Sequence, residues 1–337
     1  MSIKILTNHP GRAASPSWRE HATYVATEGD SLWSALIVAM RLFVQRANYD
    51  CVVLGAGKSD LLYGLFQTLF PFRRRPTVLI DCLWYERQNR YVQSGKKALM
   101  KAVDRSVDRY CVWASREIEA YSQCFGLPAH KFVFVPYHTT LPDEAIDVRD
   151  GGYLFAGGDS GRDYETLINA MRGVPATLHI ASMKPESFDR LNPPPNVVVR
   201  RYSSADYLKM MAGCSVNIVA LAPGLLHSAG QQTFLNSMSM GKPTIVTDPA
   251  GASDYIEDGV DGLLVEPGDP EALRSAILKL LSDPELAQRV GANALGKAGS
   301  GYSTEDHFKH IIAVVEGLLG IAGCNGGVDT CPTARLC

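Results

Sequence analysis

The residues best suited to chemistry lie in the stretch SAGQQTFLNSMSMGKP, residues 228–243. Its pattern predicts a helix, and the backbone NH groups of Gln231, Gln232 and Thr233 in the first turn have no acceptor within such a helix. Gly230, directly before them, lets a ligand approach the backbone closely. Helix starts of this kind bind anions, so we expect two linked phosphates to bind here.

A helix dipole contributes only about 0.3–1 kcal/mol at an exposed end and about 2 kcal/mol when it is partly buried. A dianion therefore also needs a nearby cation. The glycine-rich turn AGGDSGRDYETL (156–167) offers Arg162, with Gly158 shaping the turn. Because a guanidinium binds phosphate oxygens in a bidentate manner, we predict that both residues contribute to a diphosphate site. The alternative is a self-sufficient helix start beside a surface arginine.

Alternating strands and helices must position these residues. Strands are predicted at 2–7, 51–56, 77–82, 109–114, 131–137, 152–157, 176–181, 196–201, 215–221, 243–248 and 262–266. In the first half, helical patterns fall at 31–47, 59–69, 94–107 and 115–124. This alternation predicts an α/β protein with two doubly wound parallel sheets. Ligands of such sheets bind at the carboxyl ends of the strands.

The polar, proline-bearing segment 138–152 has no periodicity and predicts a linker between two domains. We expect an N-terminal domain at 1–142 and a C-terminal, nucleotide-binding domain at 143–303. A last helix at 304–319 should cross back to the first domain. The glycine-rich tail 320–337 is expected to be disordered.

Composition excludes several functional classes. The chain has 337 residues, 46% hydrophobic residues and a net charge of -2, so no bulk basic field favours a nucleic acid partner. The longest apolar stretch, 32–44, is interrupted by Arg41 and is too short to span a bilayer. A strand pattern from residue 2 leaves no room for a signal peptide. We expect a cytoplasmic protein.

The eight cysteines show no C-x-x-C or similar ligand spacing. Five fall within the predicted domains and are expected to be buried thiols. Cys324, Cys331 and Cys337 lie in the tail, where zinc or a disulfide is an alternative to disorder. No metal-ligand cluster is recognised elsewhere, and no cofactor is expected.

The segment VVLGAGKSD (52–60) follows a predicted strand and suggests a dinucleotide or P-loop motif. The first motif needs glycine or alanine where Asp60 stands, and the second needs glycine where Val52 stands. We therefore predict a glycine turn in which Ser59 or Asp60 caps the following helix.

Residues 109–319 resemble a GT-B glycosyltransferase of family 4. The resemblance rests on DRYCVWASREIEAYSQCFGLPAHKFVFVPY, on FLNSMSMGKPTIVTD and on GASDYIEDGVDGLLVEPGDPEALRSAILKLLSDPE. It implies two Rossmann-like domains that face each other across a cleft. It also implies metal-independent transfer of a sugar, of the hexosyl type, from a nucleotide-diphosphate sugar to a hydroxyl acceptor.

The chain differs from this family at two positions that bear on the reaction. Two glutamates usually stand eight residues apart around the helix, and here Ser228 and Asn236 occupy those places. Gly230 and Thr233 instead match the helix start of the related lipid-linked peptidoglycan N-acetylglucosamine transferases. The resemblance still assigns Ser228 to the nucleotide sugar, Asn236 to a ribose hydroxyl, and Asp254 to a place where the family commonly has glutamate.

The acceptor side belongs to the first domain. Asp81 ends a predicted strand where the family often has a histidine near the sugar, and His9 follows the first strand. These two residues are the candidate catalytic groups, although a lone histidine or aspartate after a strand is commonly a cap or turn residue. Tyr202, just beyond the strand at 196–201, could stack on the nucleotide base.

Two segments of the first domain suit a membrane surface. LFQTLFPFRRRP (65–76) combines apolar side chains with three arginines, and SGKKALMKAVDRSVDR (94–109) forms a basic helix. Such a surface fits the headgroup region of a bilayer that carries a lipid-linked saccharide; the alternative is a core helix followed by a solvated turn. Expected partners are a nucleotide sugar and a glycan or lipid-linked acceptor, with peripheral contact at the inner face of the membrane.

Three functions remain open from the sequence. The first is the transferase. A sugar-nucleotide epimerase on the same architecture should carry paired acids or histidines near the helix start, which Ser228 and Asn236 do not provide. A catalytically silent GT-B module that binds a glycan or a partner chain is favoured by the missing glutamates.

Overall fold

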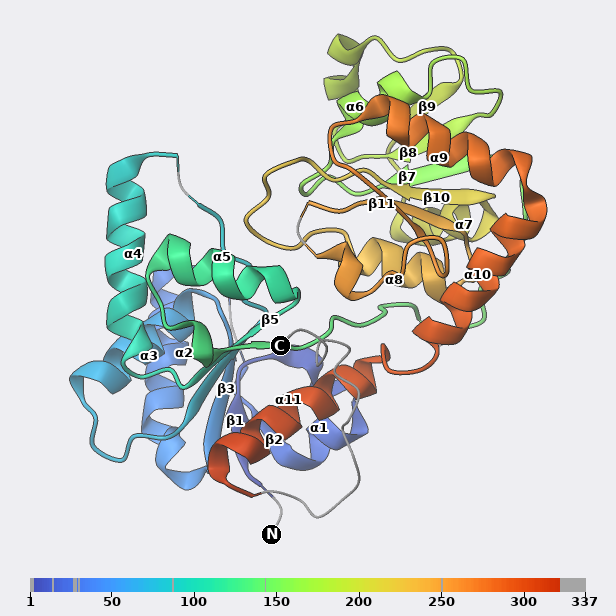
Figure 1. Cartoon of the computed structure of the whole chain (residues 1–337). Coiled ribbons are helices and arrows are strands. Elements are labelled where there is room, and N and C mark those ends of the chain that lie inside the picture. Colours follow the sequence, from blue (N-terminus) through green and yellow to red (C-terminus); the bar gives the residue numbers. More distant parts are fainter. Residues whose placement is uncertain are drawn as a thin grey trace, which may run out of the picture.

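The computed structural model describes residues 3–13, 15–26, 29, 31–86, 88–142, 144–249 and 251–321. Within them the chain forms two six-stranded parallel sheets covered by helices (Figure 1). This arrangement confirms the α/β class and the two doubly wound sheets predicted from the sequence. The three tail cysteines and the expected disorder of residues 322–337 lie outside the described residues.

The first sheet has the strand order β2-β1-β3-β4-β5-β6, and every neighbouring pair is parallel. Its strands are β1 (Ile5–Thr7), β2 (Ala22–Tyr24), β3 (Cys51–Gly55), β4 (Thr77–Ile80), β5 (Arg109–Val112) and β6 (Phe132–Phe134). Both central strands β3 and β4 consist almost entirely of buried residues, as expected for parallel strands with helices on both faces.

The helices of this half are α1 (Pro16–His21), α2 (Leu32–Gln45), α3 (Lys58–Leu69), α4 (Arg90–Asp104) and α5 (Ser115–Phe125). Helix α4 begins four residues before the predicted start, because the Asn89 side chain accepts hydrogen bonds from the backbone NH groups of Tyr91 and Val92. At α3, Asp60 accepts a hydrogen bond from Gly57 N at 2.9 Å. This contact agrees with the predicted cap.

The second sheet has the order β12-β11-β10-β7-β8-β9 and is also parallel. Its strands are β7 (Leu154–Gly157), β8 (Leu178–Ala181), β9 (Val197–Arg200), β10 (Val216–Val219), β11 (Thr244–Thr247) and β12 (Leu263–Val265). Its helices are α6 (Tyr164–Ala170), α7 (Ser204–Gly213), α8 (Gln231–Ser239), α9 (Pro270–Ser282) and α10 (Pro284–Ala298). Short 3-10 helices lie at Pro10–Ala13, Arg46–Asn48, Ala129–Lys131, Pro185–Leu191 and Ala252–Asp254.

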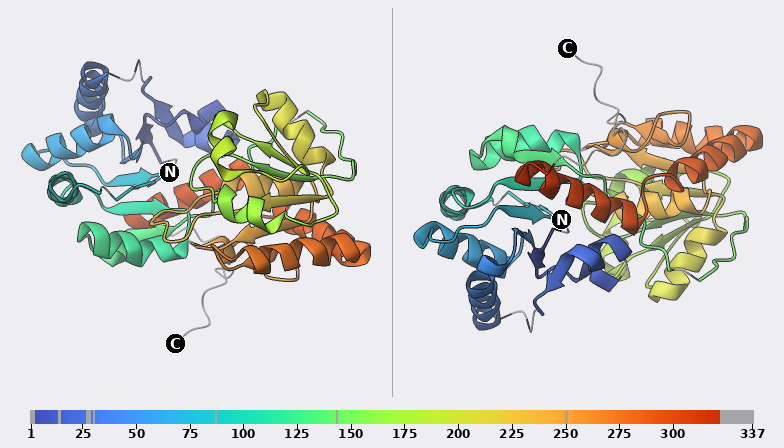
Figure 2. Two further views of the ribbon diagram at one scale, coloured as in Figure 1. Left: turned by 90° about the horizontal axis from the view of Figure 1, so that it is seen from above. Right: turned by 90° about the horizontal axis from the view of Figure 1, so that it is seen from below.

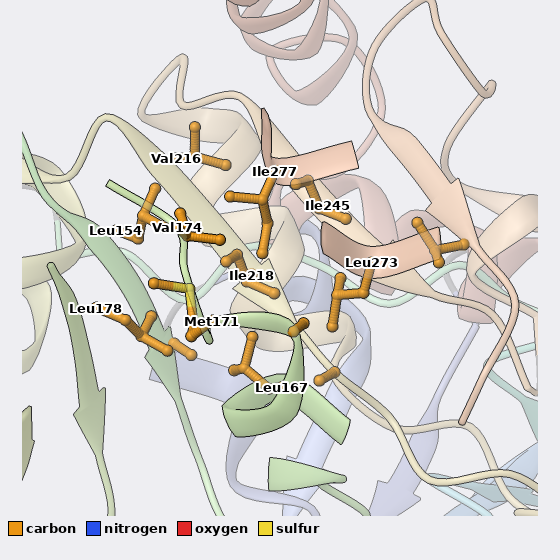
Figure 3. Packing of buried hydrophobic residues seen from close by; sticks show 14 of the residues in the cluster. Leu154, Leu167, Met171, Val174, Leu178, Val216, Ile218, Ile245, Leu273 and Ile277 are labelled. Atoms are coloured by element: carbon orange, nitrogen blue, oxygen red, sulfur yellow. The ribbon is translucent and has the colours of Figure 1, made fainter. Parts of the chain in front are cut away.

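A continuous apolar core holds the second sheet against α6 and α9 (Figure 3). Leu154, Ile218 and Ile245 from the strands pack with Leu167 and Leu273 from the helices, and all five are buried. Full burial of such a side chain contributes about 1.5–3 kcal/mol. The loops at the carboxyl ends of these strands therefore extend from a rigid base.

The segment 16–24 was not predicted, and the structure places α1 and the edge strand β2 there. Ser15 caps α1 by accepting a hydrogen bond from Trp18 N at 3.1 Å. Trp18 is fully buried, so one large side chain fixes a helix of six residues. A helix this short gives almost no periodicity in the sequence, because packing rather than propensity stabilises it.

The last helix, α11 (Thr304–Leu319), leaves the second domain and packs against the first sheet (Figures 1 and 2). Phe308, Ile311 and Val315 from α11 join the cluster that contains Ile5 and Trp18. The Phe308 and Trp18 rings lie 4.9 Å apart. The chain therefore joins the two domains twice.

Among the described residues, none of the helices combines the length and apolar character that a bilayer crossing requires.

The packing of α11 predicts a pH dependence of stability. The His307 Nδ1–H donates to the carbonyl of Pro136 at 2.6 Å, and burial lowers the pKa of His307 from 6.5 to about 4. Between these pH values the unfolded chain binds more protons than the folded chain, so the free energy of unfolding falls as the pH falls, by at most about 1.4 kcal/mol per pH unit.

His307→Gln should reduce this slope while keeping a donor to Pro136. Urea unfolding measured from about pH 7 down to about pH 5 checks this, with exposed His130→Gln as the control. Equal slopes for the two variants and the wild type would contradict the assignment.

Candidate functional site

A pocket of about 660 Å³ lies at the carboxyl ends of strands from both sheets. The first sheet contributes Leu83, which follows β4, and Trp113, which follows β5. The second sheet contributes Gly158 after β7, Tyr202 after β9 and residues 227–233 before and within α8. This is the position expected for ligands of doubly wound sheets, and the start of α8 is open to the pocket.

Arg162 lies beside the start of α8. Its guanidinium donates through Nε to Gly157 O at 3.1 Å, through Nη1 to Ser160 O at 2.8 Å and through Nη2 to Thr233 Oγ1 at 3.0 Å. Burial lowers the pKa of Arg162. Within the part of the chain that the structure describes, this guanidinium has no carboxylate partner. A fixed positive charge therefore faces the pocket without an ion-pair partner.

The start of α8 is shaped by Gly230, which has a φ of 84° and no capping side chain. A Cβ at this position would lie 2.8 Å from the Val219 side chain, so glycine is required for both space and conformation. Among the described residues, the backbone NH groups of Gln231 to Thr233 form no hydrogen bond. Three free donors thus lie at the helix start beside the Arg162 guanidinium, which contacts Thr233 Oγ1.

The other predicted nucleotide contacts lie along the same pocket. Gly158 has a φ of 96° and lies directly against the Arg162 guanidinium. Tyr202 lines the pocket near Met183, and its hydroxyl lies 3.5 Å from His179 Nδ1. The structure brings Gly158, Arg162 and Tyr202 together with the start of α8 on one wall.

Asn236 lines the pocket, but its side chain is hydrogen-bonded to Thr140, in the segment that joins the two domains. Its Oδ1 accepts from Thr140 N at 2.8 Å and its Nδ2 donates to Thr140 Oγ1 at 3.1 Å. Gln232 Nε2 also donates to this hydroxyl, at 2.8 Å. The expected hydrogen bond from Asn236 to a ribose therefore competes with a contact that already satisfies the amide.

Asp254 was assigned to the nucleotide site, and the structure places it outside the pocket. Its two carboxylate oxygens accept from Ser115 N at 2.6 Å and from Ser115 Oγ at 2.7 Å. Ser115 starts α5 in the first domain. Asp254 therefore acts as the anionic cap of a helix in the opposite domain.

The two candidate catalytic residues contact each other. His9 Nε2 lies 2.8 Å from Asp81 Oδ2, and His9 Nδ1 accepts from Gly11 N at 3.2 Å. Burial alone would raise the pKa of Asp81, but the hydrogen bond from His9 Nε2–H opposes it, and the pKa is held below its ordinary value. Neither residue lines the pocket, although Leu83, two residues beyond Asp81, does.

Sequence reasoning missed Glu117, a buried carboxylate between the domains. It accepts hydrogen bonds from Trp113 N and Ala114 N, both at 2.9 Å, from Tyr121 Oη at 3.0 Å and from Ser228 N at 2.7 Å. Burial raises the pKa of Glu117. Glu117 is the third residue of α5, a position typical of a capping box, and this pattern could have identified it from the sequence. No sequence pattern indicates its contact with Ser228.

Within the described residues, no group of three or more histidine, cysteine, aspartate or glutamate side chains is arranged to hold a metal ion.

Comparison with known proteins gives matches in sequence and in fold. Residues 154–283 match the family model "Glycosyl transferases group 1". The chain is 29% identical over 107 residues to alpha-D-kanosaminyltransferase from Streptomyces kanamyceticus. It is 33% identical over 88 residues to the lipopolysaccharide core biosynthesis mannosyltransferase LpcC from Rhizobium leguminosarum bv. viciae. These alignments cover 32% and 26% of this chain and only 27% and 25% of the relatives.

Among solved structures, HepE from Anabaena in complex with UDP superposes with a TM-score of 0.70 at 16% identity, over 94% of this chain and 100% of that chain. Sucrose-phosphate synthase from Thermosynechococcus elongatus superposes with a TM-score of 0.66 at 18% identity, over 92% and 82%. The chain therefore has the GT-B fold, and residues 154–283 carry the sequence pattern of glycosyl transferases group 1. Both findings confirm the resemblance seen in the sequence.

The position of Asp254 predicts an interdomain coupling energy. Ser115→Ala and Asp254→Ala should each lower the free energy of unfolding. The double variant should lose less free energy of unfolding than the sum of the losses of the two single variants. We expect a coupling of about 1–3 kcal/mol, since hydrogen bonds to a charged acceptor lie in this range. Urea unfolding of all four proteins measures it, and strict additivity would contradict the contact.

Proposed function

We propose that the protein is a glycosyltransferase that moves a sugar from a nucleoside-diphosphate sugar to a hydroxyl group of a glycan or lipid-linked saccharide. One observation carries the proposal. Arg162, without a carboxylate partner among the described residues, lies against the open start of α8 in a pocket between the two domains. Such a pocket is suited to two linked phosphates.

The names of similar proteins support the same class of reaction. The solved structures of HepE contain UDP in one case and UDP-glucose in another. The relatives include a capsular polysaccharide biosynthesis glycosyltransferase from Staphylococcus aureus and the mannosyltransferase LpcC. On the strength of these similar proteins, the proposal includes a role in polysaccharide biosynthesis and the transfer of a sugar of the hexose type.

In the proposed reaction the bond between the anomeric carbon and the diphosphate breaks, and the acceptor oxygen bonds to that carbon. Negative charge grows on the leaving diphosphate as the sugar becomes oxocarbenium-like. The Arg162 guanidinium and the free NH groups at Gln231 to Thr233 would stabilise that charge mainly in the transition state. This arrangement requires no metal ion.

Of the two candidate catalytic groups, Asp81 is the better general base. Both ring nitrogens of His9 are engaged, one by Asp81 Oδ2 and one by Gly11 N. The other carboxylate oxygen of Asp81, Oδ1, accepts no hydrogen bond among the described residues, and the lowered pKa leaves Asp81 ionised at neutral pH. Asp81 lies outside the pocket lining but two residues before Leu83, which is part of it. In this proposal Oδ1 takes the proton of an acceptor hydroxyl that reaches this edge of the pocket, while His9 holds the carboxylate in place.

A second candidate is a silent GT-B module that binds a glycan. Ser228 and Asn236 stand where the resemblance leads us to expect carboxylates, and the Asn236 amide already binds Thr140. A protein that binds a nucleotide sugar and never consumes it would favour this alternative.

We also propose that the first domain contacts an anionic membrane that carries the acceptor. One face of α2, here the α2 stripe, exposes Trp33, Ile37, Met40 and Val44, which are between 50% and 75% exposed. Their spacing of four, three and four residues places them on one side of the helix. An exposed apolar stripe on a surface helix is typical of an interfacial helix.

The charges around the α2 stripe favour anionic lipid. The loop after α3 exposes Phe70 and Phe72, and Arg46 Nη2 ties it to the end of α2 through the carbonyl of Phe72 at 2.8 Å. Arg41 on α2 and Arg73 in the loop are exposed. Apolar side chains flanked by arginines suit acyl chains below a layer of negative headgroups.

The diphosphate site predicts a specific effect of Arg162→Ala. Loss of a charged hydrogen-bonding group costs about 1.5–3 kcal/mol, which corresponds to about a 10- to 150-fold weaker affinity. Isothermal titration with UDP, GDP, ADP and dTDP and with their nucleosides should show this loss for the diphosphates only. The matched control is Arg289→Ala, an exposed arginine on α10. Equal loss for nucleosides and diphosphates would assign Arg162 a structural role.

The membrane proposal predicts that the protein sediments with vesicles of phosphatidylglycerol and much less with vesicles of phosphatidylcholine. Ile37→Ser combined with Val44→Ser should weaken binding by about tenfold or more, since burying one such side chain contributes about 1.5–3 kcal/mol. Leu295→Ser, at an exposed leucine of α10, is the control. Unchanged sedimentation of the double variant would exclude the α2 stripe as the contact.

A further inference from the structure

A second pocket, of about 540 Å³, lies at the opposite edge of the second sheet from the diphosphate site. Val216 begins β10 and Pro243 directly precedes β11, so these lining residues mark the amino ends of the strands. Leu281 and Pro284, where α9 is followed by α10, form the other side. The volume lies in the range of small-molecule sites, about 300–1,000 Å³. The proposed sugar transfer uses none of these residues.

Lys242 lies in the interior of this pocket. It is 6% exposed, and its Nζ donates to the carbonyl of Arg149 at 2.6 Å. Within the described part of the chain this ammonium forms no ion pair. Burial lowers the pKa of Lys242 below its ordinary value. An ammonium so placed is costly to leave without a counter-ion, and an anionic ligand would supply one.

Asp150 is the acidic residue of the same lining, and it is exposed. Its Oδ1 accepts from Ser215 Oγ at 2.5 Å and from Gly152 N at 2.9 Å, and these hydrogen bonds hold the pKa of Asp150 below its ordinary value. The charge of Asp150 raises the pKa of Lys242, but the effect of burial is larger. Asp150 is thus bound to its own loop, and a ligand must place its negative charge at Lys242 and away from Asp150.

Aliphatic side chains form most of the wall on the α9 and α10 side: Leu280, Leu281, Ala287, Ala292 and Leu295. Leu295 is 49% exposed, so an apolar group bound against it would be removed from water together with it. A Cβ on Gly291 of α10 would overlap the carbonyl oxygen of Gly241. This close approach fixes α10 against the segment that carries Lys242, so the charge and the apolar wall belong to one pocket.

The surroundings of Lys242 favour a single negative charge on the ligand. Among the residues that line this pocket, all of which the structure describes, no other side chain is cationic. A phosphate monoester carries a charge of about -1.5 to -2 at pH 7 and needs more donors. The start of α10 does not provide them, because Asp283 caps it and Pro284 has no NH group. A carboxylate carries one charge and matches one ammonium.

We infer that this pocket is a second binding site, which takes a small molecule with one carboxylate and an aliphatic chain. The carboxylate pairs with Lys242 Nζ, and the chain lies against Leu281 and Leu295. Lys242 follows the last turn of α8, whereas the diphosphate site is at the first turn, about 14 Å away for a helix of nine residues. The ligand is therefore neither the sugar donor nor its leaving group, and the inference does not depend on the proposed function.

Octanoate is the probe, and isothermal titration at pH 7 should show one site per chain. Octanol, octylammonium and octyl phosphate should each bind at least about tenfold more weakly, because none presents a single negative charge to Lys242. Lys242→Met, which keeps the length of the side chain, should weaken octanoate binding by about tenfold or more. Leu295→Ser should weaken it by about three- to tenfold. The matched controls, Lys279→Met and Leu278→Ser, change exposed residues of α9 outside the lining and should bind octanoate like the wild type.

The site is wrong if octanoate does not bind, or if Lys242→Met and Lys279→Met bind it alike. Octyl phosphate that binds as tightly as octanoate contradicts the choice of a carboxylate. The double variant of the α2 stripe, Ile37→Ser/Val44→Ser, should keep the octanoate affinity, and its loss would place the probe on that stripe instead. Thermal unfolding identifies any variant that has lost its fold. If Lys242→Met has done so, the comparison of Leu295→Ser with Leu278→Ser decides.

Titration of the same proteins with UDP separates this site from the proposed function. Lys242→Met should bind UDP like the wild type. Binding of octanoate without binding of any nucleoside diphosphate would overturn the proposed function and leave this site standing. Binding of UDP without binding of octanoate would overturn this site alone.

Discussion

The charge of Arg162, which has no ion-pair partner among the described residues, is the constraint on which the rest of the pocket depends. Three protein oxygens, two of them backbone carbonyls, fix the guanidinium in place, and none of them carries a formal charge. A half-buried charge of this kind is costly to leave without a counter-ion. Gly158 and Gly230 must be glycine beside it, because a side chain at either position would meet the guanidinium or the wall of β10. The glycines, the arginine and the start of α8 thus serve one purpose.

The pocket is complete only when both domains are in place. Asp254 from the second domain caps α5 of the first, and Glu117 from α5 binds the backbone of Ser228 in return. Helix α11 packs on the first sheet and joins the domains again. These contacts place the wall formed by Trp113 opposite the wall formed by α8. A change in the relative position of the domains would therefore alter the site directly.

Sequence reasoning predicted what local patterns determine. The second-domain strands, the helix at α8 and the grouping of Arg162 with Gly230 follow from periodicity, helix termini and phosphate chemistry. The role of Asp254 and the contact from Asn236 to Thr140 could not be predicted, because each depends on a partner about 100 residues or more away in the sequence. The short helix α1 was missed for a similar reason, since the burial of Trp18 fixes it. Long-range partners leave no local signal.

The most direct test of the central claim is a crystal structure of the protein with a bound nucleoside diphosphate. The account predicts diphosphate oxygens within hydrogen-bonding distance, about 3 Å, of the Arg162 guanidinium and of the NH groups at the start of α8. A diphosphate bound elsewhere, with Arg162 still engaged only by Gly157, Ser160 and Thr233, would contradict it.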